Sequence, residues 1–133
     1  MKKFPPERIV CLTEETVETI YLLGEEKRIV GVTGYATRPK QVRNEKPRIS
    51  SFISANVDKI IDLKPDLVVV VAFGQIIPNS YLQIPNLIFL NVHASLLPKW
   101  RGAAPIQRSI MNLDQETGIS IMKINEKLDR GPV

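Results

Sequence analysis

The chain has 133 residues, the usual size of one domain, and its 44% hydrophobic and 24% charged residues exclude a disordered or collagen-like protein. Eighteen Lys and Arg residues against fourteen Asp and Glu residues give a net charge of +4, which permits an anionic partner without requiring one. The single cysteine, Cys11, excludes an intramolecular disulfide and a cysteine-rich zinc site. Its apolar neighbours predict a buried side chain, and the use of only one cysteine indicates a reducing compartment.

Neither a membrane span nor an export signal is predicted. The longest apolar run, Leu67 to Phe73, has the length of a strand and is far too short to cross a bilayer. Prolines and charged residues occupy positions 5–8, where a signal peptide would require an apolar stretch. We therefore expect a cytoplasmic protein that makes no membrane contact.

The first part of the chain predicts a strand, a helix and a second strand. An apolar strand over residues 8–12 leads to Thr13, whose hydroxyl can cap a helix, and Gly24 can supply the left-handed residue that ends it. Residues 28–33 form the second predicted strand. The polar stretch of residues 31–47, which contains Gly34 and two prolines, predicts a long surface loop.

The middle and the end of the chain continue the alternation of predicted strands and helices. Asn56 can cap a second helix, which Pro65 ends. Residues 67–72 are apolar at every position, as is typical of a strand covered on both faces of a parallel sheet. Three further elements are predicted: a strand over residues 87–92, a helix over residues 103–111 and a strand over residues 118–124. In the last strand the apolar residues Ile119 and Ile121 alternate with polar ones, and Met122 fits this alternation less well.

This alternation predicts an α/β fold, a three-layer α/β/α sandwich of flavodoxin-like or Rossmann-like type. Its core is a mostly parallel five-stranded sheet with the strand order 2-1-3-4-5. We expect residues 1–133 to form a single domain.

The sharpest chemical feature lies at the end of the fourth predicted strand. Asn91 and His93 are two residues apart and therefore share one face at the carboxyl edge of the sheet, where open α/β sheets bind ligands. An amide and an imidazole can stabilise the oxyanion that forms when a nucleophile attacks a carbonyl. Asp129 is the candidate carboxylate that would act on the imidazole. A lone histidine at a strand end is, however, more often a hydrogen-bonded structural residue.

Two other segments admit both a functional and a structural interpretation. Lys99, Trp100 and Arg101 can stack on and pair with a nucleotide or a pterin carboxylate, or can simply anchor a loop. Gly74 can let the backbone line a pocket or only permit the turn after the third predicted strand. No nucleotide-binding glycine motif or metal-ligand motif occurs in the chain, and no metal is expected.

The second half of the sequence resembles the catalytic domain of methionyl-tRNA formyltransferase in four segments, at residues 69–78, 91–108, 116–122 and 128–131. The resemblance implies that Asn91, His93 and Asp129 are the residues that transfer a formyl group from 10-formyltetrahydrofolate to an amine. It also implies that the last predicted strand is antiparallel. The residues that it implies lie beside the folate are Phe73, Gly74, Gln75, Ile76, Ile77 and Pro78.

The first half, residues 1–68, is instead similar to the amino-terminal lobe of periplasmic binding proteins for cobalamin and iron siderophores. That resemblance rests on residues 8–24, 28–33 and 56–69. The two resemblances meet in the apolar strand near residues 67–71, which we call the seam. A crossover inside a buried central strand preserves side-chain alternation and the packing faces. We therefore interpret the chain as a chimera, recombined or designed.

Each resemblance covers only part of its family's fold, so we expect a folding scaffold with no complete native active site and with little or no turnover. The first alternative is a truncated formyltransferase module that retains weak folate binding or slow transfer. The second alternative is a one-lobe module that binds cobalamin or a siderophore. Binding to tRNA is not expected, because the family's tRNA-binding domain is absent. We expect a monomer or an adventitious dimer.

Overall fold

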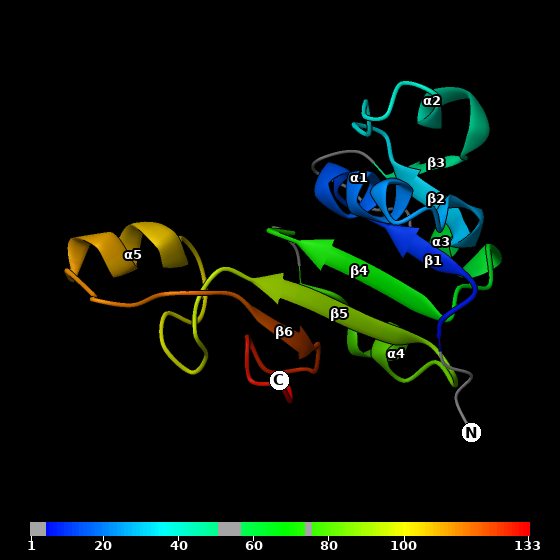
Figure 1. Ribbon diagram of the computed structural model, residues 1–133. Helices are drawn as coiled ribbons and strands as arrows, with labels where there is room; N and C mark the ends of the chain where they lie inside the picture. The colour runs from blue at the N-terminus through cyan, green and yellow to red at the C-terminus, as the bar shows by residue number, and fades with distance from the viewer. Residues whose placement is uncertain (1–4, 51–56, 74–75) are drawn as a thin grey trace.

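A six-stranded sheet in the order β3-β2-β1-β4-β5-β6 forms the centre of the computed structural model, which describes residues 5–50, 57–73 and 76–133 (Figure 1). Strands β1 to β5 all run parallel to one another, and β6 is antiparallel to β5. The strands are β1 (Ile9–Cys11), β2 (Ile29–Thr33), β3 (Arg48–Ser50), β4 (Leu67–Val71), β5 (Ile88–His93) and β6 (Ser120–Lys123). The predicted fold class, the relative order of the five predicted strands and the antiparallel last strand are confirmed. The predicted strand count of five is wrong, because β3 adds a sixth strand beside β2.

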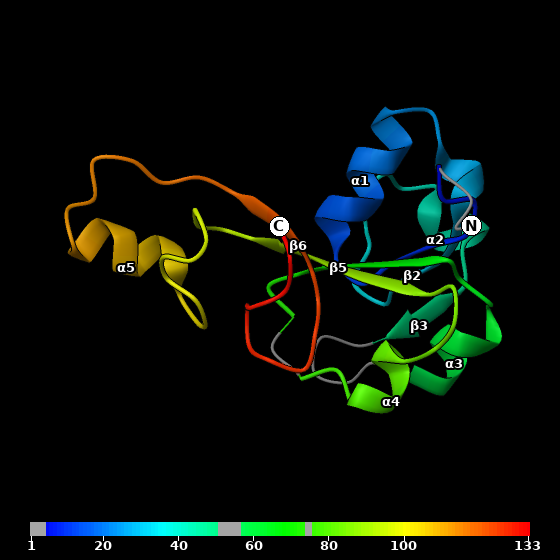
Figure 2. The same ribbon diagram turned by 90° about the horizontal axis from the view of Figure 1, so that it is seen from below.

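Helices cover both faces of this sheet. The helices are α1 (Glu14–Leu22), α2 (Val42–Glu45), α3 (Val57–Asp62), α4 (Asn79–Leu82) and α5 (Pro105–Met111), with a 3-10 turn η1 (Glu26–Arg28). Figures 1 and 2 show α1 and α2 on one face, α3 and α4 on the other, and α5 beyond the edge of the sheet. Within the described ranges, no helix has the length and apolar character of a membrane span.

Strand alternation divides the core into two layers. In β1, Val10 faces the cluster that contains Ile60 of α3, whereas Ile9 and Cys11 face the cluster that contains Val17 of α1. The Cys11 side chain is completely buried, as predicted. Each fully buried aliphatic side chain contributes about 1.5–3 kcal/mol to stability, so the two layers together fix the sheet from both sides.

The local signals around α1 are only partly confirmed. Gly24 has a φ of +71°, the left-handed conformation predicted for the end of this helix. Thr13 lies at the N-cap position, but its side chain makes no capping hydrogen bond. Instead the Thr16 hydroxyl donates to the Thr13 carbonyl oxygen at 2.9 Å. The predicted cap at Asn56 lies outside the described residues.

The prediction of a long loop over residues 31–47 is wrong in part. Strand β2 continues to Thr33, α2 forms within the stretch, and β3 follows directly. Buried Val42 and Ile49 hold α2 and β3 against the core, and the Lys46 ammonium donates to the carbonyl oxygens of Glu26 and Ile29 at 2.6 and 3.0 Å. Helix α4 is also absent from the predicted elements. Such short elements carry no periodicity in the sequence, and only tertiary contacts stabilise them.

The last predicted strand forms, but the apolar side chains that define its predicted pattern point away from the core. Met122 and Ser120 are buried, while Ile119 and Ile121 are 66% and 58% exposed. The alternation is present, but the apolar side chains of Ile119 and Ile121 lie on the uncovered face. The helix predicted over residues 103–111 begins at Pro105 and lies off the sheet rather than forming part of a covering layer.

Candidate functional site

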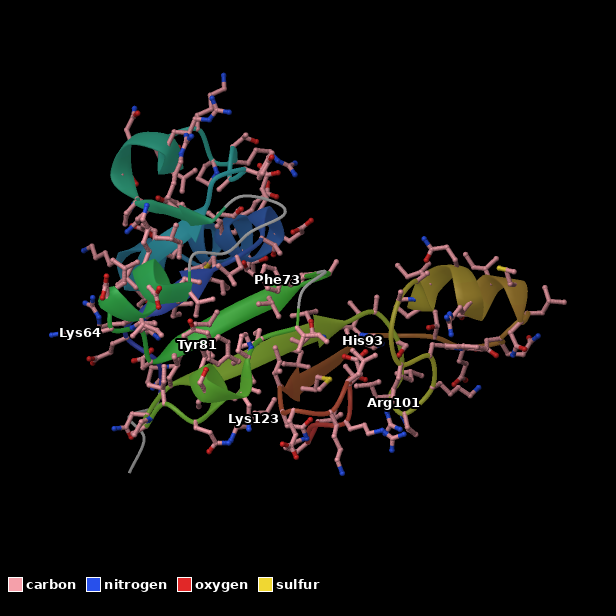
Figure 3. All side chains as sticks on the ribbon, turned by 180° about the vertical axis from the view of Figure 1, so that it is seen from behind. Lys64, Phe73, Tyr81, His93, Arg101 and Lys123 are labelled. Atoms are coloured by element: carbon pink, nitrogen blue, oxygen red, sulfur yellow. The ribbon has the colours of Figure 1, made fainter. Side chains whose placement is uncertain are left out.

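The predicted trio of polar side chains comes together at the carboxyl edge of β5. Asn91 and His93 lie on one face of β5, and Asp129 reaches them from the segment that follows β6. Figure 3 labels His93 at the end of this strand. Two residues of one strand share a face. Antiparallel β6 starts beside His93 and runs toward the start of β5, pairing Ser120 with His93 and Lys123 with Leu90. The segment after β6 then returns, which brings Asp129 to the end of β5. Topology therefore brings together residues that are 38 positions apart in the sequence.

Asp129 is the centre of the group. Its Oδ1 lies 3.5 Å from the Asn91 amide nitrogen, and its Oδ2 lies 3.7 Å from His93 Nδ1. The His93 side chain is 6% exposed and the Asp129 side chain 10% exposed, so the charge interactions occur largely out of bulk water. Low exposure strengthens such interactions. Both distances are longer than those of ideal hydrogen bonds.

The backbone of Trp100 fixes the other side of the imidazole. His93 Nε2 lies 2.9 Å from the Trp100 carbonyl oxygen. A carbonyl oxygen can only accept, so this hydrogen bond requires a proton on Nε2. The ring is thereby oriented with Nδ1 toward Asp129. Nδ1 and the Asn91 amide then face the same carboxylate, where both can interact with a reacting carbonyl group.

Two neighbours that the sequence analysis did not assign to the site hold Asp129. The Gly102 amide donates to Asp129 Oδ2 at 2.7 Å, and Arg101 Nε donates to the Asp129 carbonyl oxygen at 2.8 Å. Asp129 itself has a φ of +47°, which is unfavourable for a residue with a side chain. The sequence admits ligand binding or loop anchoring for Arg101; in the structure its Nε anchors the loop, and the residue also lines the basic pocket described below. No sequence signal pairs Gly102 with Asp129.

The segment predicted to lie beside folate divides between core and surface. Phe73 and Ile77 pack against the core cluster of the α3 and α4 face, and Ile76 is 87% exposed. Pro78 directly precedes α4. Gly74 and Gln75 lie outside the described residues. Figure 3 shows Phe73 at the end of β4, next to the strand that ends in His93.

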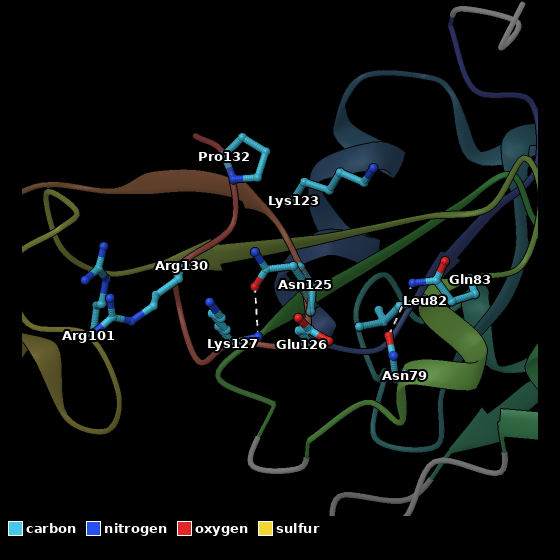
Figure 4. Close-up of a pocket in the computed structure, with 11 residues that line it drawn as sticks. Asn79, Leu82, Gln83, Arg101, Lys123, Asn125, Glu126, Lys127, Arg130 and Pro132 are labelled. Carbon is cyan, nitrogen blue, oxygen red and sulfur yellow. Dashed lines mark hydrogen bonds between the residues drawn. The ribbon is translucent and has the colours of Figure 1, made fainter.

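A pocket of about 720 Å³ lies between α4 and the segment after β6 (Figure 4). It is strongly basic, and Glu126 is its single acidic lining residue. Within the described parts of the chain, Lys123, Lys127 and Arg130 have no ion-pair partner. Among the described residues, neither the trio nor the segment predicted to lie beside folate lines this pocket; its lining residues Asn79 and Arg130 are next to Pro78 and Asp129 in the sequence. Residues 5–50, 57–73 and 76–133 contain no group of three potential metal ligands.

Comparison with known proteins identifies the sequence relatives. The profile of a family described as formyl transferase matches residues 11–133. A methionyl-tRNA formyltransferase of Pelagibacter ubique is 73% identical over 75 residues, which are 56% of this chain and 24% of that protein. The enzyme of the same name from a Wolbachia strain is 53% identical over 85 residues, which are 64% of this chain and 28% of that protein. The chain thus spans about a quarter of the length of these relatives.

Two kinds of solved structure resemble the fold. A phosphoribosylglycinamide formyltransferase from Anaplasma phagocytophilum has a TM-score of 0.74 and 18% identity, and the match covers 95% of this chain and 68% of that one. At this identity the likeness describes the fold alone. A periplasmic vitamin B12 binding protein of Vibrio cholerae has a TM-score of 0.57 and 28% identity, with 71% of this chain and 37% of that one covered.

Proposed function

The chain belongs to the formyl transferase family, and from this premise we propose that its site moves a formyl group from 10-formyltetrahydrofolate to an amine. The observation that carries the proposal is the convergence of Asn91, His93 and Asp129 at one sheet edge. In the reaction, a bond forms between the amine nitrogen and the formyl carbon, and the bond from that carbon to the donor nitrogen breaks. The amine loses a proton and the donor nitrogen gains one.

Each member of the trio has a distinct role in this proposal. Asn91 donates its amide hydrogen to the formyl oxygen as negative charge develops there, a contribution of about 2.7–4 kcal/mol for one well-placed donor. His93 exchanges the proton through Nδ1, because Nε2 is occupied by the Trp100 carbonyl oxygen. Asp129 stabilises the positively charged imidazole that results from proton uptake.

The basic pocket fits the donor. A folate carries carboxylates on its glutamate tail, and the pocket is lined by Lys123, Lys127 and Arg130, which have no ion-pair partner in the described parts of the chain. Its volume of about 720 Å³ lies within the usual range for small-molecule sites. The acceptor amine, including that of a methionyl-tRNA, belongs to the proposal only by analogy with the relatives of that name.

A direct experiment titrates the chain with 5-formyltetrahydrofolate, a stable donor analogue, and follows amide signals by NMR. We expect shifts around Asn91, His93, Asp129 and the pocket, and expect His93→Ala to abolish transfer while the fold is retained. The proposal fails if millimolar ligand produces no shifts, or if transfer persists in His93→Ala.

The second candidate is the chimeric scaffold without turnover. Two observations favour it: the 28% identity to the vitamin B12 binding protein, and the short 75- and 85-residue stretches shared with the two methionyl-tRNA formyltransferases. The family match begins at residue 11 and therefore extends across the proposed seam at residues 67–71. Titration with cyanocobalamin tests the binding-protein alternative: that alternative requires shifts confined to the first half, whereas a scaffold without function would bind neither ligand.

A further inference from the structure

Trp100 connects the candidate site to a second, separate carboxylate. Its carbonyl oxygen accepts the hydrogen bond from His93 Nε2 at 2.9 Å, and its indole Nε1 donates to Asp114 Oδ2 at 2.5 Å. The backbone of Trp100 has a φ of +56°, the left-handed conformation. A residue with a side chain maintains this conformation only where its surroundings hold it in place.

Asp114 is well placed to hold Trp100. It lies in the loop after α5, and its side chain is only 6% exposed. The Asn112 amide donates to Oδ1 at 2.7 Å, and the Lys99 ammonium lies 3.8 Å from the same oxygen. The hydrogen bond from the Trp100 indole, with that from Asn112, lowers the pKa of Asp114. A carboxylate forms a stronger hydrogen bond with the indole than a neutral acceptor does.

In the described parts of the chain, the other hydrogen bonds of the loop after β5 are made by residues on either side of Trp100, and on its far side Arg101 and Gly102 bind Asp129. Ser95 Oγ donates to the Lys99 carbonyl oxygen at 2.6 Å, and Ser120 Oγ donates to the Ser95 carbonyl oxygen at 2.8 Å. These bonds fix the first half of the loop to β6. At Trp100 itself, the side-chain hydrogen bond to Asp114 supplies the restraint.

We propose that Asp114 is a positioning residue for His93, which acts through Trp100 to keep the imidazole proton on Nε2 and leave Nδ1 directed at Asp129. Asp114 contacts no reacting atom in this arrangement. The expected change in the rate of formyl transfer rests on the proposed function, but the expected change in the imidazole tautomer does not.

The NMR signals used in the test have only one possible assignment, because the sequence contains one histidine, His93, and one tryptophan, Trp100. Imidazole nitrogen shifts in a long-range proton–nitrogen NMR spectrum report the tautomer of His93. The indole N–H signal reports the bond to Asp114. We expect the wild-type imidazole to show one fixed tautomer, protonated at Nε2.

Three variants remove the restraint to different degrees. Asp114→Ala removes the acceptor, Trp100→Phe removes the donor but keeps an aromatic ring, and Asp114→Asn keeps an acceptor oxygen without the charge. We expect averaged imidazole signals in the first two variants and an intermediate result in the third. Lys99→Ala is the matched control, because Lys99 also contacts Asp114 but is 66% exposed, and we expect wild-type signals.

The rate of formyl transfer is a second measurement, independent of the NMR signals. We expect kcat for formyl transfer to fall roughly tenfold in Trp100→Phe with little change in the donor KM, because the group that exchanges the proton is misplaced while the pocket is intact. Wild-type imidazole signals in folded Asp114→Ala and Trp100→Phe would overturn the inference. If the wild-type chain shows no transfer, the proposed function fails while the NMR result still decides the role of Asp114.

Discussion

The carboxylate of Asp129 accepts a hydrogen bond from the backbone amide of Gly102 at 2.7 Å. This bond joins the loop after β5 to the segment after β6, the two pieces of chain that form the candidate site. Asp129 therefore has two tasks, since the same Oδ2 atom also lies 3.7 Å from His93 Nδ1. Substitutions can separate the structural task from the electrostatic one.

Asp129→Asn separates them, because an asparagine oxygen can still accept from Gly102 but carries no charge. We expect formyl transfer to fall about a hundredfold, equivalent to about 2.7 kcal/mol in the activation free energy. The melting temperature should change little. Asp58→Asn, which removes an exposed charge on α3, is the control. An unchanged rate of transfer in Asp129→Asn would show that the charge of this carboxylate plays no part in the reaction.

Gly131→Ala tests how the segment after β6 holds Asp129. A Cβ atom at Gly131 would lie 1.6 Å from the Lys123 carbonyl oxygen, so the segment must move away from β6. That movement breaks the bond from the Lys123 amide to the Pro132 carbonyl oxygen, now 2.9 Å. We expect a loss of roughly 1–3 kcal/mol in the free energy of unfolding, measured by urea denaturation, together with lower transfer.

The control for this prediction is Gly24→Ala. Gly24 has a φ of +71°, but a Cβ atom added there would meet nothing within 4 Å, and the residue lies at the far end of α1. The substitution should cost about 1–2 kcal/mol through backbone strain alone and leave transfer unchanged. Equal effects of both substitutions on transfer would show that general destabilisation, and not movement of Asp129, is responsible.

Charge reversal in the basic pocket tests donor binding. We expect Arg130→Glu to raise the KM for 10-formyltetrahydrofolate about tenfold and to leave kcat largely unchanged, because the pocket cations attract the donor's carboxylates. The effect should diminish at high salt. Lys40→Glu is an exposed charge reversal away from the pocket and serves as the control. A kcat effect without a KM effect would contradict the assignment.

Cys11 should be inert in the folded chain. Burial raises the pKa of its thiol from the usual 9.0 to about 11, so at pH 8 the folded chain holds about a hundredfold less thiolate than the unfolded chain. We expect iodoacetamide to modify Cys11 only after denaturation, as followed by mass spectrometry. Rapid modification of the native protein would show that β1 opens frequently.

Glu14 should make stability depend on acidity. The hydroxyl of Thr37 donates to its Oε1 at 2.5 Å, and this bond, with those from the Thr37 and Arg38 amides, lowers the pKa of the Glu14 carboxyl. A lowered pKa means that the stabilisation is present above the unfolded-state value and is lost as the pH falls through the folded-state value.

Melting temperatures of the wild type and Glu14→Gln between pH 7 and pH 2 measure this dependence. We expect the wild type to be more stable at neutral pH and the difference to vanish in acid. Glu15→Gln, in the same helical turn, should follow the wild-type curve. A difference between wild type and Glu14→Gln that is constant with pH would contradict the prediction.

Local sequence patterns predicted much of the fold and part of the site. The apolar runs of β1, β4 and β5, the glycine that ends α1 and the i, i+2 spacing of Asn91 and His93 are signals within a few residues of chain, so they can be recognised without a structure. Helices α2 and α4 and strand β3 have only three or four residues each, too few for a periodic pattern, and contacts with distant residues stabilise them.

The sequence by itself determined the α/β class, the burial of Cys11 and the identity of the three candidate catalytic side chains, because each depends on residue type and short-range spacing. Only the tertiary structure decided that Trp100 and Gly102 support His93 and Asp129, that Ile121 faces outward and that α5 lies off the sheet. These features depend on which distant segments meet, and that is set by the packing of the whole sheet.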